Sequence, residues 1–133
     1  MRVCLALAAD ARASVGKLPR RLGKTLAVAK HEVAAFAYLS RAGTLLGTHT
    51  IGSSLPDLVE LPIRRIVRQA ILLDADALVM AHNHPSGIAR PSRTDIDTTR
   101  RLSRTLAMFD VLLVDHWIVT ADTRVSLRAL GLM

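Results

Sequence analysis

The chain has 133 residues, half of them hydrophobic, and this length suits one packed domain and leaves little room for two. Only 3% of the residues are aromatic, so Ala, Leu, Val and Ile must build most of the core, and few rings are present for nucleic-acid bases to stack on. The formal net charge is +7, carried mostly by Arg, which attracts nucleic acids, acidic proteins or anionic lipids but indicates no particular fold.

Cysteine usage and hydropathy predict a cytoplasmic protein. A single thiol, Cys4, provides neither a disulfide framework nor a thiolate zinc site, so we expect a reducing compartment. The apolar run at residues 3–9 is short for a secretory signal and is followed directly by Asp10. No stretch approaches the roughly 20 apolar residues that span a bilayer. We therefore expect no membrane contact, and the sequence carries no signal for an oligomeric state.

The first half of the chain predicts a helix followed by a hairpin. Residues 1–18 are weakly patterned, and residues 19–31 predict a short basic helix with Pro19 near its start. Residues 33–40 and 44–51 have the composition of strands, and the turn-like Arg41-Ala42-Gly43 lies between them. Residues 52–57 contain Gly, Ser, Pro and Asp and predict a loop.

The second half alternates helices and strands. Pro62 fits the first turn of a helix to about Leu73, because its apolar residues recur at the spacing of one helical face. Residues 77–81 predict a buried strand and residues 82–91 a loop. Ser92 begins a helix that ends near Met108, residues 111–120 predict a long strand, and residues 124–133 close the chain. This alternation predicts an α/β fold with a sheet flanked by helices.

The stretch from His82 to Asp95 contains the residues most suited to chemistry. His82 and His84, two residues apart at a strand end, project toward the same side and can share one metal ion. Ser92 is typical of a helix N-cap, and Asp95 three residues later lies in the first turn, where the helix dipole favours negative charge. Either motif alone is common without a metal. Together they predict a site with two His and one carboxylate, which leaves a fourth position open as catalytic zinc sites do.

A zinc hydrolase also needs a general base to accept the proton of its water. The chain has two glutamates, Glu32 and Glu60. Glu32 opens the first strand, which we expect beside the strand at residues 77–82. Glu60 precedes Pro62 at a helix start, where capping and the helix dipole explain an acidic residue without catalysis. We therefore favour Glu32 as the base and keep Glu60 as the alternative.

These residues resemble the JAMM signature of the JAB/MPN metalloprotease superfamily. That signature is an upstream Glu, then His-x-His-Pro, seven residues between the second His and a Ser, and an Asp three positions further on. His82, His84, Ser92 and Asp95 have this spacing. The strings HNHPSG, PSRTD, TRRL and VDHWIV are similar to the bacterial RadC-like branch, over about Glu32–Leu132. We therefore divide the chain into a lead-in, residues 1–31, and a RadC-like metal-binding domain, residues 32–133.

The resemblance implies a fold, a cofactor and an activity. The implied fold is a mixed sheet between helices, in the three-layer α/β architecture shared with cytidine deaminases. His82, His84 and Asp95 would hold Zn²⁺, Glu32 would act as base and then as acid, and Ser92 would donate to the oxyanion of the tetrahedral intermediate. Eukaryotic and archaeal relatives cleave an isopeptide or peptide bond next to a ubiquitin-like C terminus. The implied enzyme is therefore a zinc metallopeptidase or isopeptidase with a peptide or protein substrate.

The alternative function is a DNA-repair-associated, nucleic-acid-binding module with a structural or vestigial metal site. RadC-like proteins usually carry a helix-hairpin-helix region before this domain, and residues 1–31 are too short for one. The scattered arginines and few aromatic residues also weaken this alternative. A third possibility is a partner-binding scaffold without activity.

The remaining histidines are expected to be less important. His116, beside Asp115, is either half of a pair behind the metal site or, as we favour, a hydrogen-bonded strand residue. His31 and His49 are expected at the surface, and Cys4 receives no role.

Overall fold

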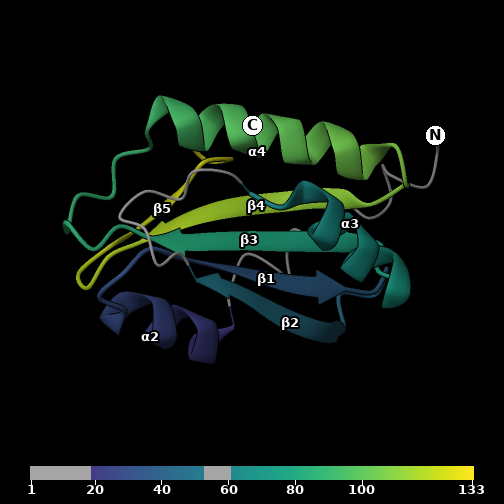
Figure 1. The fold of residues 1–133 in the computed structure, drawn as a ribbon, viewed down its shortest axis with the longest axis horizontal. Helices are drawn as coiled ribbons and strands as arrows, with labels where there is room; N and C mark the ends of the chain where they lie inside the picture. The colour runs from purple at the N-terminus through teal and green to yellow at the C-terminus, as the bar shows by residue number, and fades with distance from the viewer. Residues whose placement is uncertain (1–18, 53–60) are drawn as a thin grey trace.

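The computed structural model describes residues 19–52 and 61–133, in which a five-stranded sheet of order β2-β1-β3-β4-β5 lies between helices (Figure 1). Strands β3 and β4 are parallel, and the other neighbouring pairs are antiparallel. The predicted α/β fold, a mixed sheet flanked by helices, is thus confirmed. The elements are α2 (Arg20–Val28), β1 (Val33–Leu39), β2 (Leu45–Gly52), α3 (Ile63–Leu72), β3 (Ala77–Asn83), α4 (Arg93–Ala107), β4 (Leu112–Val119) and β5 (Arg124–Ser126).

Three layers arise because β1 and β3 bury both of their faces. Successive strand side chains point to opposite faces of a sheet, and those of β1 and β3 alternate between two hydrophobic clusters. One cluster contains Leu22 and Leu26 of α2. The other contains residues of both α3 and α4. Figure 1 shows α2 and α4 on opposite sides of the sheet, which agrees with these two clusters.

The expected helices and the expected hairpin are confirmed. Each described helix begins directly after the residue predicted to start it: Pro19, Pro62 and Ser92. Strands β1 and β2 pair antiparallel, with a turn that places Gly43 at a φ of +82°, a backbone conformation that glycine adopts without steric cost.

Two details of the strands differ from the prediction. The predicted loop at residues 82–91 begins too early, because His82 and Asn83 are still in β3 and pair with Ile118 and Val119 of β4. Their polar side chains interrupt the apolar run that marked the strand in the sequence. Residues 124–126 form a short edge strand, β5, which the sequence did not predict because three residues are too few to show a periodicity.

Some predictions fall on residues outside the described ranges. These are the weakly patterned residues 1–18 with Cys4, most of the predicted loop at residues 52–57, and the alternative base Glu60. The division of the chain at residue 31 stays a prediction. Leu22 and Leu26 of α2 are nevertheless buried against the sheet, so that helix packs with the elements that follow it.

The helices of the described residues are short relative to a bilayer. The longest, α4, has 15 residues, against about 20 for a membrane span. Among residues 19–52 and 61–133, none of the helices combines the length and the apolar composition that crossing a membrane requires.

Candidate metal centre

Strand β3 brings the two histidines of the motif together. His82, in β3, is 3% exposed and on the same face as Met80, toward α3 and α4. His84 follows the strand, and its N–H donates to the carbonyl of Val119 over 3.0 Å, which extends the pairing with β4 by one residue. The two Nε2 atoms lie 2.8 Å apart, so the prediction that both imidazoles project toward the same side is confirmed.

The first turn of α4 adds a carboxylate. Ser92 and Asp95 form a capping box: the Asp95 N–H donates to Ser92 Oγ over 3.0 Å, and the Ser92 N–H donates to Asp95 Oδ2 over 2.7 Å. The same carboxylate lies 3.3 Å from Nε2 of His82 and 3.4 Å from Nε2 of His84. The cap that begins the helix therefore also fixes this carboxylate between the histidines. Ser92 Oγ accepts in the cap, which leaves its own O–H as a donor.

The residue directly before β1 supplies the fourth group. Glu32 immediately precedes β1, which pairs antiparallel with β3 so that Ala34 lies opposite His82. Its Oε1 is 3.6 Å from Nε2 of His82. One ligand atom from each of Glu32, His82, His84 and Asp95 lies within 4.8 Å of the others. The structure thus brings the favoured base to the three predicted ligands.

Asn83 fixes the backbone on both sides of Glu32, a role that we did not predict. It is 2% exposed and is in β3 between the two histidines, so its side chain points to the opposite face of the sheet. Its Oδ1 accepts from the Val33 N–H over 2.6 Å, and its Nδ2 donates to the carbonyls of His31 and Ala29 over 2.9 and 3.2 Å. A buried Asn needs such partners, but the predicted loop at residues 82–91 gave no indication that Asn83 is buried.

A second set of buried polar groups lies behind His82. His116 of β4 is 1% exposed, and its Nε2 is 2.6 Å from Nδ1 of His82. Its Nδ1 is 2.5 Å from Oγ1 of Thr99 in α4. His116 is thus a hydrogen-bonded strand residue, as favoured, and it also contacts a proposed ligand. Asp115 is not its side-chain partner, because that carboxylate accepts from Ser126 Oγ–H and from backbone N–H groups.

The other histidines lie away from the cluster. His31 is exposed, as expected. His49, expected at the surface, is partly buried on β2, with its ring 5.9 Å from that of Phe36.

Electrostatic interactions in the cluster favour an ionised carboxylate on Asp95. The pKa of His84 is raised chiefly by its hydrogen bond to Asp95, and burial opposes this shift. Burial acts to raise the pKa of Asp95, but its interactions with His82, His84 and the Ser92 N–H outweigh burial, and the pKa lies well below its ordinary value. The carboxylate is therefore negative at neutral pH, the state in which it attracts a cation.

The donor set fits a zinc ion. His84 Nδ1 lies 2.8 Å from the carbonyl of Ile88, which can only accept, so Nδ1 carries the proton and the neutral ring turns the Nε2 lone pair toward the cluster. Tetrahedral zinc with bonds of about 2.0–2.1 Å places its ligand atoms about 3.3 Å apart. The distances among the ligand atoms of His82, His84 and Asp95 here are 2.8–3.4 Å.

A small cavity of about 30 Å³ lies beside these groups and has room for about one water molecule. It is lined by Glu32, Leu61, Met80, His82, Thr94, Asp95, Thr98 and His116. The cluster thus has space next to it for a reacting molecule.

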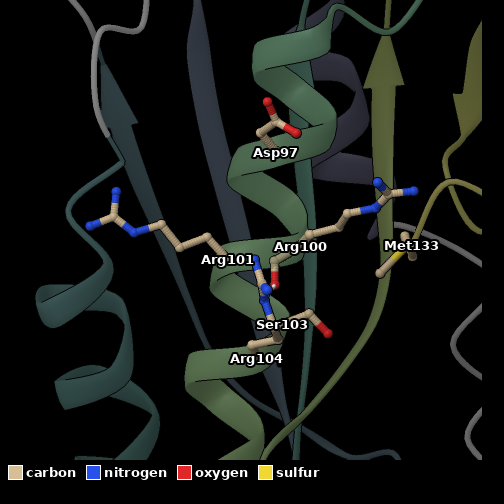
Figure 2. Close-up of a pocket in the computed structure, with 6 residues that line it drawn as sticks. All are labelled: Asp97, Arg100, Arg101, Ser103, Arg104 and Met133. Atoms are coloured by element: carbon tan, nitrogen blue, oxygen red, sulfur yellow. Dashed lines mark hydrogen bonds between the residues drawn. The ribbon is translucent and has the colours of Figure 1, made fainter.

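A larger hollow, of about 620 Å³, lies over the outer side of α4 and does not include the cluster. Figure 2 shows Arg100 extending toward Met133 and Arg101 toward the opposite side of the helix, with Arg104 between them. Nε of Arg100 donates to the Leu132 carbonyl, and Nε of Arg104 donates to the Arg100 carbonyl. These guanidinium groups do not converge on one point, so the hollow is not arranged around a single anion.

Comparison with known proteins supports the resemblance seen in the sequence. A family model described as a RadC-like JAB domain matches residues 13–132. A UPF0758 protein of Neisseria meningitidis serogroup C (strain 053442) is 42% identical over 104 residues, which cover 78% of this chain and 46% of that protein. One from Acidithiobacillus ferrooxidans (strain ATCC 53993) is 37% identical over 110 residues, 83% of this chain and 49% of that protein.

A third relative is more similar in sequence, but over fewer residues. The UPF0758 protein of Bordetella petrii is 50% identical over 70 residues, which cover 53% of this chain and 31% of that protein. The chain thus spans about half the length, or less, of these curated relatives. Because the family model covers most of the chain and the mixed sheet agrees with it, the chain belongs to the RadC-like JAB domain family.

Proposed function

We propose that the chain is a zinc-dependent hydrolase of the JAMM type, which cleaves a peptide or isopeptide bond in a protein or peptide substrate. The observation that carries this proposal is the convergence of Glu32, His82, His84 and Asp95 at the end of β3. Two imidazoles and one carboxylate are a ligand set that catalytic zinc sites use, with a place left for water. The arrangement unites residues from three elements and fits the zinc ligand spacing.

The four residues and Ser92 divide the chemistry among them. A zinc ion held by His82, His84 and Asp95 would lower the pKa of a water molecule toward about 7. Glu32 accepts a proton from that water and passes it to the leaving amine, as base and then as acid. Ser92 donates its O–H to the oxyanion that forms on the substrate carbonyl oxygen when water adds to the carbonyl carbon.

The competing proposal, a nucleic-acid-binding module with a structural metal site, draws its support from the net charge of +7. It predicts DNA binding whose affinity falls steeply with salt, because binding releases counterions from the phosphates. Arg100 and Arg101 diverge in Figure 2, so these two side chains of α4 do not form a shared phosphate site.

The decisive experiment combines metal analysis with a substitution of the base. The purified protein should contain one zinc per chain, and His82→Ala and Asp95→Ala should lose it. Glu32→Gln should keep the zinc but lose turnover of peptide and isopeptide substrates, because an amide cannot accept the proton. Glu60→Gln, at the other glutamate, is the matched control and should retain turnover. Normal turnover by Glu32→Gln, or an absence of zinc in the parent protein, would overturn the proposal.

A further inference from the structure

A chain of three hydrogen bonds connects one proposed zinc ligand to the backbone of another. His82 Nδ1 lies 2.6 Å from His116 Nε2, and His116 Nδ1 lies 2.5 Å from Thr99 Oγ1. Thr99 in turn donates to the main-chain carbonyl of Asp95 over 2.6 Å. The three side chains are at most 3% exposed, so these groups bond to one another rather than to bulk water. This series of hydrogen bonds runs from β3 through β4 to α4.

Chemistry dictates the direction of each bond. The Asp95 carbonyl can only accept, so the single hydroxyl proton of Thr99 lies between these two oxygens. Thr99 Oγ1 must then accept from His116, whose proton is therefore on Nδ1. A neutral imidazole carries one N–H, so His116 Nε2 is an acceptor and His82 Nδ1 is the donor. The lone pair of His82 is consequently on Nε2, which faces Asp95 and His84.

The surroundings keep His116 neutral, as this assignment requires. Its ring is 1% exposed, and a positive charge buried without a paired carboxylate is costly. Trp117 and Asp115, its neighbours along β4, point to the other face of the sheet, where the Asp115 carboxylate accepts from Ser126. Each hydrogen bond in this series has one donor and one acceptor when His116 is neutral, so the series needs no charge on His116.

We propose that His116 and Thr99 are positioning residues that hold His82 in its Nδ1–H tautomer and couple the strand-borne ligand to the helix-borne ligand. The inference rests on the proposed function, because it concerns how a zinc ligand is presented. Hydrogen bonds to the second nitrogen of a ligating histidine orient its ring and raise its basicity, and their loss costs about 10–100-fold in metal affinity. Here the supporting partner is a second imidazole.

The same helix provides a matched control. Thr hydroxyls often donate to the carbonyl four residues earlier in a helix without any further role. Thr105 of α4 does this with Arg101 over 2.9 Å. Thr99→Val and Thr105→Val thus remove the same kind of bond, but only the first also removes an acceptor for His116. Thr99→Ser keeps the hydroxyl and serves as the conservative variant.

The first measurement reads the tautomer in metal-free protein, so it does not depend on zinc binding. Long-range ¹H–¹⁵N spectra of ¹⁵N-histidine-labelled protein should show His116 protonated on Nδ1. This pattern should persist in Thr99→Ser and Thr105→Val, whereas in Thr99→Val the Nδ1 preference should weaken. A His116 proton on Nε2 in the parent protein would overturn the proposed direction of the chain.

The second measurement is zinc affinity, from competition with a chromogenic chelator, together with the visible spectrum of the cobalt-substituted protein. Thr99→Val and His116→Leu should bind zinc about 10–100-fold more weakly, with an altered cobalt spectrum. Thr99→Ser and Thr105→Val should match the parent. Parental affinity in both Thr99→Val and His116→Leu would overturn the proposal; if His116→Leu does not fold, Thr99→Val decides. A parent protein that binds no zinc contradicts the proposed function, and the tautomer then tests the hydrogen-bond chain separately.

Discussion

At His84, a proton and a metal ion compete for one nitrogen atom. Its Nδ1–H is committed to the Ile88 carbonyl, so a second proton must enter at Nε2, toward Asp95. The hydrogen bond to Asp95 raises the pKa of His84, which means that the metal-free protein holds this proton at a higher pH than an ordinary histidine does. Asp95 therefore stabilises positive charge next to His84, whether that charge is a proton on Nε2 or a bound metal ion.

Zinc affinity should consequently depend on pH. It should be constant above the raised pKa of His84 and fall as the pH drops through that pKa, because zinc must then displace a proton. Zinc titrations between about pH 5.5 and 8 test this, since ordinary histidine titrates near 6.5. NMR titration of metal-free protein should place the pKa of His84 above 6.5, and Asp95→Asn should lower it. An affinity independent of pH in this range would show that no proton is displaced.

Asp95 adds a contribution at acid pH. Its pKa is lowered in the folded protein, so the carboxylate stabilises the metal-free fold above the unfolded-state pKa of about 3.9. That stabilisation is lost as the pH falls below this value toward the folded-state pKa. Acid unfolding of the metal-free parent should therefore be steeper than that of Asp95→Asn, which has no carboxylate to protonate. Identical acid transitions for the two proteins would contradict the lowered pKa.

At the scale of single elements, the connection between α2 and β1 depends on a residue in another strand. Replacing Asn83 with Leu would leave the Val33 N–H and the carbonyls of Ala29 and His31 without their partner. We expect a loss of about 2–4 kcal/mol of stability, measured by urea unfolding. Turnover should fall further than stability explains while zinc is retained, because Glu32 lies between these anchors. Full turnover with Asn83→Leu would show that Glu32 is positioned by other contacts.

The capping box at the start of α4 makes a separate prediction. Ser92→Ala should cost about 1 kcal/mol of stability, because the Asp95 N–H loses its acceptor. If Ser92 also donates to the oxyanion, turnover should fall about 10²–10³-fold. Ser92→Thr keeps the hydroxyl and should preserve most of both properties. If Ser92→Ala had parental stability and parental turnover, Ser92 would have neither the capping role nor the oxyanion role.

Elements that are specified by neighbouring residues in the sequence could be predicted, and those that depend on contacts between distant residues could not. Helix starts at Pro19, Pro62 and Ser92 depend on local backbone chemistry and were predicted. The end of β3 was not, because His82 and Asn83 stay in the strand through their pairing with β4. The contact between His82 and His116 joins residues 34 positions apart and depends on the parallel β3–β4 register. No local pattern encodes such a contact.

At the scale of the whole molecule, the proposed zinc ion would join two separate parts of the fold, beside a base from a third. Its ligands come from the end of β3 and from α4, and Glu32 precedes β1. Zinc that binds only the folded chain should stabilise it by about 2.7 kcal/mol at 100 times its Kd. Thermal unfolding should therefore shift upward by several degrees with zinc, and EDTA should reverse the shift. His82→Ala should show none; an equal shift in that variant would place the zinc elsewhere.

The sequence indicated the fold class and the neighbours of β1, but not the full strand order of the sheet. Alternating helices and strands predicted a sheet flanked by helices, and the JAMM spacing predicted which side chains meet. The strand order and the parallel pairing of β3 with β4 depend on the two-faced burial of β1 and β3, whose residues are apolar on both sides. Such strands show no alternation, so the face to which each side chain points could not be assigned from residues such as Ala35 and Phe36.

X-ray absorption at the zinc edge of the loaded protein tests the central claim most directly. We predict one zinc per chain with four nitrogen or oxygen neighbours at about 2.0–2.1 Å, two of them imidazoles, and the loss of the zinc in His84→Ala, as in His82→Ala. A sulfur neighbour, a shell without imidazole, or zinc well below one per chain would contradict it.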